Sequence, residues 1–145
     1  MEVQSYLFFD GRCEEALDFY RRAVGAEVDA VMRFSDSPEG PAACGPDGKP
    51  MPPEHLKKIM HASFRVGKTT ILASDGMCGG NPVFQGSSLA LMVPGEGEAK
   101  RYFDALGDGG QVQMPLSKTF FSAAFGMVAD RFGVSWMVVA DEAKE

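Results

Sequence analysis

Glu15-Ala16-Leu17-Asp18-Phe19-Tyr20 and Glu98-Ala99-Lys100-Arg101-Tyr102-Phe103 place the same acidic, small and aromatic residues at two points of this 145-residue chain. Each phrase follows an apolar, strand-like run, Val3 to Asp10 before the first and Gly86 to Val93 before the second. Each half also ends on a Gly-led segment that closes in Asp. An internal repeat of this kind indicates one supersecondary unit present twice. We therefore predict two strand-helix-three-strand modules with a cleft between the copies.

The first half changes from a strand period to a helical one. Alternation with a period of two predicts a strand from Val3 to Asp10, and apolar residues three and four apart predict a helix from Arg12 to Val24. We expect Asp10 to cap this helix and Gly25 to end it in a left-handed conformation. The other strands of this half are expected at residues 26–34, 59–66 and 69–75.

The second half repeats this order. Its helix is expected at residues 95–106, and its strands at 85–93, 111–116, 119–128 and 134–140. A stretch rich in proline and glycine between Ser35 and Leu56 predicts a long loop inserted in the first copy. We predict an α+β fold in one domain, 1–145, made of two βαβββ modules that form a pair of half-barrels. The first module is 1–76, the linker 77–84 and the second module 85–141.

Bulk composition narrows the classes of partner. The net charge of −6 disfavours nucleic acid, because such binding depends on Lys and Arg neutralising phosphates. An odd count of three cysteines without metal-type spacing favours a reducing, cytoplasmic setting. No stretch approaches the ~18 apolar residues of a membrane span, and the first residues do not read as a signal peptide. We expect neither membrane nor nucleic acid as a partner.

Four phrases in this order resemble the PhnB-like branch of small bacterial proteins in the vicinal oxygen chelate superfamily. That superfamily includes glyoxalase I, bleomycin and fosfomycin resistance proteins and extradiol dioxygenases. The phrases are Phe8-Phe9-Asp10-Gly11-x-x-Glu14-Glu15-Ala16-Leu17-x-Phe19-Tyr20, Lys58-Ile59-Met60-His61-Ala62, Met114-Pro115-Leu116 and Phe125-Gly126-Met127-Val128-x-Asp130-Arg131-Phe132-Gly133-Val134-x-Trp136. The resemblance spans nearly the whole chain and implies paired βαβββ modules and a homodimer.

The resemblance also implies where a metal would bind. Catalytic members carry four His or Glu ligands on the first and fourth strands of each copy. Matching the helix phrases places the first-strand positions at Ser5 and Ser88, and aligning the final strands places the others at Ile71 and Met137. Zinc, nickel and iron prefer imidazole, thiolate or carboxylate over hydroxyl and thioether groups. We therefore predict that the cleft holds no metal and needs no cofactor.

The leading functional prediction is a small-molecule-binding protein of the glyoxalase/bleomycin-resistance class, with a small apolar or aromatic ligand. Aromatic walls with a few polar groups are typical of such clefts. The candidate ligand-binding residues are Ser5, His61, Ser88, Phe121, Trp136 and Met137.

Two other functions stay open. One is an enzyme, a lyase, isomerase or dioxygenase-like protein, that uses His61 or a metal at noncanonical positions. The other is a structural or regulatory dimer without a ligand, which predicts a cleft filled by its own aromatic side chains. The alternative to catalysis for His61 is a structural histidine that hydrogen-bonds a neighbouring strand or a dimer partner. A methyltransferase, a label that some PhnB-like proteins carry, is disfavoured because the sequence lacks the parallel α/β pattern of the usual cofactor site. Cys13 is expected to be a small buried residue.

Overall fold

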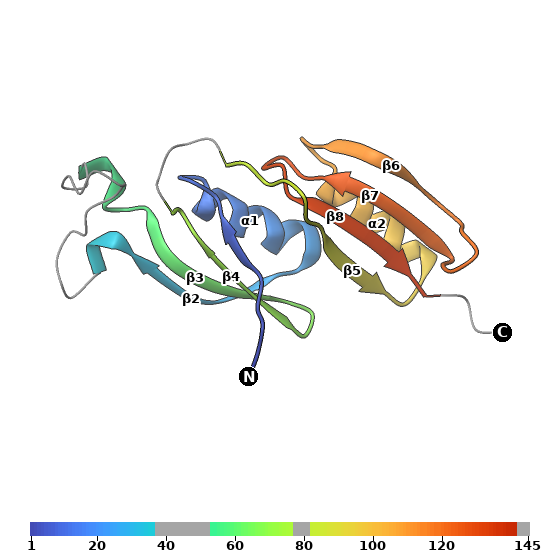
Figure 1. Ribbon diagram of the computed structural model, residues 1–145, viewed down its shortest axis with the longest axis horizontal. Helices are drawn as coiled ribbons and strands as arrows, with labels where there is room; N and C mark the ends of the chain where they lie inside the picture. Colours follow the sequence, from blue (N-terminus) through green and yellow to red (C-terminus); the bar gives the residue numbers. More distant parts are fainter. Residues whose placement is uncertain (37–52, 77–81, 142–145) are drawn as a thin grey trace. The chain divides into compact units, whose positions relative to one another are not determined.

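The computed structural model describes residues 1–36, 53–76 and 82–141 (Figure 1). The chain divides into two compact units, residues 1–82 and 83–145. Each unit holds one helix and a four-stranded mixed sheet in the order βαβββ. The predicted α+β fold of two repeated modules is therefore confirmed.

The first unit consists of β1 (Tyr6–Phe8), α1 (Cys13–Val24), β2 (Glu27–Arg33), β3 (Ile59–Val66) and β4 (Thr69–Ser74). Its strand order is β1-β4-β3-β2, with β1 parallel to β4 and the other pairs antiparallel. Short 3-10 turns at Phe34–Asp36 and Pro53–His55 follow β2 and precede β3. Most of the predicted long loop, with Cys44, lies outside the described residues.

The second unit consists of β5 (Leu89–Val93), α2 (Glu96–Leu106), β6 (Gln111–Ser117), β7 (Ala124–Ala129) and β8 (Ser135–Ala140). Its strand order, β5-β8-β7-β6, repeats that of the first unit, and β5 runs parallel to β8. Most of the predicted linker, with Cys78, and the acidic tail after Asp141 lie outside the described residues.

One face of each sheet packs against the helix of its own unit (Figure 1). In the first unit Phe64 pairs with Ile71 across β3 and β4, and the Tyr20 ring of α1 stacks on Phe64 at 5.8 Å between centroids. In the second unit the same face carries Val128 and Trp136, both buried. The opposite face of each sheet, called here the open face, carries the alternate residues of the strands.

A carboxylate distant in sequence completes the start of α1. The expected cap, Asp10, instead takes a left-handed conformation with φ 51°, and Arg12 holds the N-cap position without a side-chain cap. Asp75, which follows β4, accepts hydrogen bonds from the backbone N–H groups of Gly11 (2.9 Å) and Cys13 (2.7 Å). It also accepts one from Ile59 N–H at 2.7 Å. The helix start is therefore tied to the sheet, because an unpaired terminal N–H group needs an acceptor.

Several other boundaries differ from those predicted. The first strand covers only Tyr6–Phe8, since Val3 is 98% exposed and makes no sheet pairing. In the second unit β5 begins at Leu89 and β7 at Ala124, later than alternation suggested. The helix stop at Gly25 is confirmed, with φ 66°. Among the described residues, no helix is long and apolar enough to cross a membrane.

Candidate functional site

The open face of the first sheet carries an aromatic–imidazole pair. The Tyr6 hydroxyl lies 3.1 Å from His61 Nδ1, and the two rings are 5.7 Å apart between centroids. Phe8 lies beside Tyr6, with ring centroids 4.9 Å apart. Both β1 residues are exposed, Tyr6 by 38% and Phe8 by 57%. This pair leaves His61 Nε2 as the ring nitrogen available to a ligand.

A charged cluster lies farther along the same face. Arg65 on β3 binds the carboxylates of Asp29 and Glu27 on the neighbouring strand, at 2.9 and 2.6 Å. The hydrogen bond and charge of Asp29, followed by the charge of Glu27, raise the pKa of Arg65. Arg65 is thus committed to partners on β2 and remains positively charged.

The first-strand position at Ser5 does not share a face with Tyr6. Strand alternation turns its side chain to the opposite side, while its carbonyl accepts a hydrogen bond from Leu72 N–H at 2.9 Å. Ile71, the predicted fourth-strand position, is 4% exposed and pairs with Phe64 in the core. Leu72 instead pairs with Tyr6.

The predicted equivalence of Ile71 with Met137 is therefore wrong, because Ile71 is buried on the helix face and Met137 lies on the open one. The cause lies in the connections between the last two strands of each unit. Gly67 and Lys68 alone join β3 to β4, whereas residues 130–134 join β7 to β8. Aligning the glycines at 67 and 133 shifts the final strand by one residue, and such a shift exchanges the two faces.

The open face of the second sheet brings Ser88 and Met137 together with residues that sequence reasoning did not select. Ser88 Oγ lies 3.1 Å from both the carbonyl oxygen and Oγ of Ser135. Ser135 Oγ donates to Gln113 Oε1 at 2.9 Å. Met137 pairs with Met127 on the adjacent strand. Strands β6 and β8 and the segment before β5 thus contribute one chain of hydrogen bonds, which lies beside two methionines.

This chain of hydrogen bonds borders a hollow of about 630 Å³. None of the described residues that line it carries a charged side chain. Its lining residues are Phe84, Gln85, Gly86, Ser87, Ser88, Gln113, Met127, Gly133 and Ser135. Because Gln113 Oε1 accepts from Ser135, its amide Nε2 keeps two N–H donors for another partner. The hollow can therefore offer hydrogen-bond donors and a thioether surface to a neutral group.

Two of the predicted ligand-binding residues lie elsewhere in the second unit. Trp136 is 2% exposed on the helix face, and its Nε1–H donates to Asp130 Oδ2 at 2.9 Å. Phe121, which precedes β7, is 49% exposed and packs edge-on against Phe120 and Phe125. The structure thus places Trp136 in the core, because β8 alternation turns its side chain away from Met137.

A metal site requires several strong ligands at one place. Within residues 1–36, 53–76 and 82–141, no three His, Cys, Asp or Glu side chains gather in a way that could hold an ion. Cys13 is fully buried at the start of α1. Burial, followed by the charges of Asp75 and Glu14, raises the pKa of its thiol. This thiol is therefore neither a ready nucleophile nor a ready ligand.

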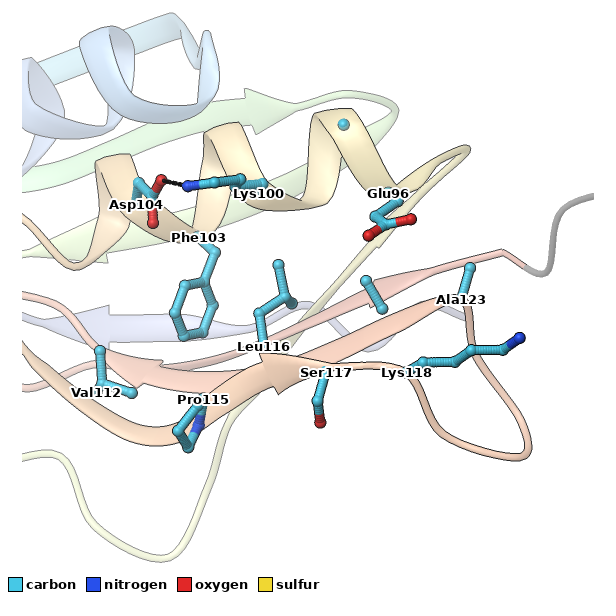
Figure 2. A pocket seen from close by; sticks show the side chains of 12 residues that line it. Glu96, Lys100, Phe103, Asp104, Val112, Pro115, Leu116, Ser117, Lys118 and Ala123 are labelled. Carbon is cyan, nitrogen blue, oxygen red and sulfur yellow. Dashed lines mark hydrogen bonds and ion pairs between the residues drawn. The ribbon is translucent and has the colours of Figure 1, made fainter.

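A second cavity, of about 740 Å³, lies between α2 and β6 (Figure 2). Sequence reasoning did not predict it. Phe103 on the helix and Leu116 on the strand lie side by side in its apolar part (Figure 2). The available signal was Gly126, a glycine in the middle of a strand, which often marks a close approach of another group. We call this cavity the α2–β6 groove.

Comparisons with known proteins agree over nearly the full chain. A sequence model of the family described as 3-demethylubiquinone-9 3-methyltransferase matches residues 1–139. Protein YjdN of Escherichia coli (strain K12) is 35% identical over 141 residues, which are 95% of this chain and 94% of YjdN. The crystal structure of protein PA1353 from Pseudomonas aeruginosa shares 39% identity, with a TM-score of 0.79 over 97% of this chain and 98% of that one.

More distant structures share the fold. A putative 3-demethylubiquinone-9 3-methyltransferase, PhnB protein, from Bacillus cereus is 27% identical, with a TM-score of 0.74 over 97% of this chain and 99% of that one. The fosfomycin resistance protein FosX from Mesorhizobium loti is 9% identical and has a TM-score of 0.59 over 96% of this chain and 90% of its own. At that identity the likeness is one of fold alone.

Proposed function

The chain belongs to the family described as 3-demethylubiquinone-9 3-methyltransferase, and from this premise we propose that it binds a neutral small molecule on the open face of its second sheet. It is a PhnB-like protein with the fold of glyoxalase-related proteins. Folds of this kind host many activities, so the residues of the site have to carry the functional argument.

The observation that carries the proposal is the chain of hydrogen bonds through Ser88, Ser135 and Gln113. It fixes the orientation of the Gln113 amide, because Oε1 is engaged by Ser135. The two Nε2 hydrogens then favour a ligand with a carbonyl or other neutral acceptor. Met127 at the edge of the hollow supplies a polarizable surface for an apolar body. A carboxylate ligand gains no cation from the described residues, since none of those that line the hollow is Lys or Arg.

Binding is proposed to be independent of metal. The donors at the hollow are hydroxyls and amides, which are weak ligands for zinc, nickel or iron. A transition metal added at low micromolar concentration should therefore leave the melting temperature unchanged. Metal-dependent stabilisation would contradict this part of the proposal, because a ligand that binds only the folded state raises its stability.

The ligand class can be tested with three probes that share a phenyl body: phenylacetamide, phenylacetate and phenethylamine. We expect phenylacetamide to shift the ¹⁵N resonances of Ser88, Ser135 and the Gln113 side chain, and the two charged probes to shift them less. Gln113→Leu should weaken phenylacetamide binding by about tenfold, the effect of losing about 1.4 kcal/mol of hydrogen bonding. Gln111→Leu is the matched control, since Gln111 lies on the same strand and does not line the hollow. Equal shifts by all three probes would overturn the proposal.

A second candidate function is acid–base catalysis by His61. The Tyr6 hydroxyl can hold the imidazole in one tautomer, which leaves Nε2 either to take or to give a proton. If His61 acts as a base, the protein should accelerate exchange of the α-hydrogens of benzylacetone in deuterium oxide. His61→Gln should abolish this acceleration and Tyr6→Phe should reduce it. A rate equal to that of buffer would exclude this activity for the probe.

The methyltransferase activity in the family's description is not extended to this chain. The described residues contain parallel strand pairs only at β1–β4 and β5–β8. Neither pair forms the doubly wound parallel sheet with a Gly-rich turn that the usual cofactor site requires. Isothermal titration with S-adenosylmethionine should therefore show no binding.

A homodimer is also proposed. Its support is the large apolar side chains exposed on the second unit, including Met92 (62%), Met114 (46%) and Phe120 (93%). Exposed apolar surface of this kind favours association. Analytical ultracentrifugation should give twice the mass of the chain, and a monomer at micromolar concentration would contradict the proposal.

A further inference from the structure

The α2–β6 groove exists because the helix does not cover the whole of its sheet. α2 packs on β7 and β8, with a smaller contact to β5, while β6 is the edge strand on the far side of β7. The gap between helix and edge strand has a volume of about 740 Å³. This lies in the range of about 300–1,000 Å³ that is typical of small-molecule sites.

The middle of the groove is apolar. Phe103 projects from α2 toward Leu116, and Val112 and Pro115 extend this wall along β6 (Figure 2). The Phe103 ring lies so close to Gly126 that a Cβ there would come within 2.7 Å of Phe103 Cε2. The absence of a side chain at Gly126 thus allows the Phe103 ring to pack directly against the sheet. The rest of the groove beside the ring is not filled.

The charged groups at the rim are not equivalent. Lys100 is neutralised by Asp104 on the next turn of α2, at 2.7 Å. The Lys118 side chain extends outward, with its ammonium pointing away from the groove, whereas the Glu96 carboxylate is directed from the helix toward the strand (Figure 2). Among the described residues, Glu96 has no ion-pair partner. The group that faces the mouth of the groove is therefore an uncompensated anion.

We propose that the α2–β6 groove is a second ligand site, which binds a lipophilic primary amine. The apolar body packs against Phe103 and Leu116 in the open part of the groove, and the ammonium donates to the Glu96 carboxylate. An exposed pair of this kind contributes little by itself, but here the apolar contact fixes the position of the cation beside the anion. This site lies wholly in the second unit and does not depend on the function proposed for the hollow at Gln113.

Glu96 has one structural role that must be separated from binding. It lies in the first turn of α2, where an acidic residue stabilises the helix dipole. Glu98 lies in the same turn, is also exposed and does not line the groove. Glu98→Gln therefore removes the same charge from the same helix end without touching the proposed site.

The test uses phenethylamine, phenylacetamide and phenylacetate with the full ¹⁵N-labelled chain. Phenethylamine should shift the amide resonances of Gly97, Leu116 and Ala123 and bind more tightly than phenylacetamide by about tenfold. Glu96→Gln should remove this preference, and Glu98→Gln should preserve it. Ala123→Phe, which fills the groove from the segment before β7, should prevent binding of all three probes at these resonances.

Several outcomes would overturn the proposal. Equal affinity for the amide and the amine, tighter binding of phenylacetate, or equal losses in the Glu96 and Glu98 variants would each exclude Glu96 as the recognition group. Absence of shifts at the groove would exclude the site. Resonance shifts confined to Ser88, Ser135 and Gln113 would also exclude the groove as a ligand site, but they would agree with the function proposed for the hollow.

Discussion

The two units build the same layer of helix on sheet and fill it differently. Tyr20 and Phe103 hold equivalent places in the repeated helix phrase. Tyr20 is fully buried and stacks on Phe64, so aromatic rings fill the first layer. Phe103 meets Gly126 instead, and a groove remains beside it. The difference shows that a duplicated framework can keep its topology while the equivalent aromatic residue is stacked on another ring in one copy and borders a groove in the other.

The units also differ in how a buried carboxylate is used. Asp75 links segments far apart in sequence, since it accepts from Gly11, Cys13 and Ile59. Asp130 acts within one turn, accepting from Phe132 N–H and from Trp136 Nε1–H. One carboxylate therefore joins the helix to the sheet, and the other shapes a connection between two strands.

The largest difference between the two units is expected when the equivalent aromatic residues, Tyr20 and Phe103, are each replaced by Ala. Tyr20→Ala should cost about 3–5 kcal/mol of unfolding free energy, because it leaves a closed cavity beside Phe64. Phe103→Ala should cost less, about 2–3 kcal/mol, because the site already opens into the groove and water can enter. Urea unfolding followed by circular dichroism measures both. A larger loss for Phe103→Ala would show that the second layer is as tightly filled as the first.

The next largest difference in unfolding free energy is expected between variants of the two buried carboxylates, Asp75 and Asp130. Asp75→Ala should cost about 3 kcal/mol, since it leaves buried backbone N–H groups at the helix start and at β3 without an acceptor. Asp130→Ala should cost about 1–2 kcal/mol, because its turn can rearrange locally. Hydrogen exchange should show faster exchange of the α1 amides in the Asp75 variant alone. Intact protection of α1 in that variant would contradict the proposed link.

A smaller effect is expected from filling the space at Gly126. A Cβ there meets Phe103 Cε2 at 2.7 Å and the Leu116 backbone at 3.0 Å. Because a ring can shift and a paired strand resists, Gly126→Ala should cost about 1–3 kcal/mol. Thermal unfolding measures the loss. An unchanged melting temperature would mean that β6 moves freely away from β7.

The smallest effect concerns pH and is confined to the first unit. The pKa of Cys13 is higher in the folded chain than in the unfolded one, so the stability that its neutral thiol contributes is complete at neutral pH. It falls as the pH rises above about 9, where the unfolded thiol ionises. The comparison uses two proteins that both carry Cys44→Ser and Cys78→Ser, one with Cys13 and one with Cys13→Ala. As the pH rises above about 9, the urea concentration at the unfolding midpoint should fall more steeply in the protein that keeps Cys13. An identical dependence of the urea midpoint on pH in the two proteins would refute the contribution of the Cys13 thiol.

The local sequence pattern was sufficient to predict an element where the apolar residues followed one clear strand or helix period. The strand at 59–66, the helix ending before Gly25 and the repeat of βαβββ units were all predicted from residues close together in the chain. The candidate site was predicted less well. Ser88 and Met137 do lie on one open face, but their partners Gln113 and Ser135 are joined to it only through sheet pairing.

The sequence by itself determined that this chain is a duplicated α+β unit, because period and turn chemistry are local properties. Only the tertiary structure decided which face each strand residue takes. The two connections at 67–68 and 130–134 differ in length, and a shift of one residue turns Ile71 into the core while Met137 stays outside. Three other features have the same origin: the burial of Trp136, the use of Asp75 in place of Asp10 at the helix start, and the open α2–β6 groove. Each depends on contacts between residues that are brought together only by folding.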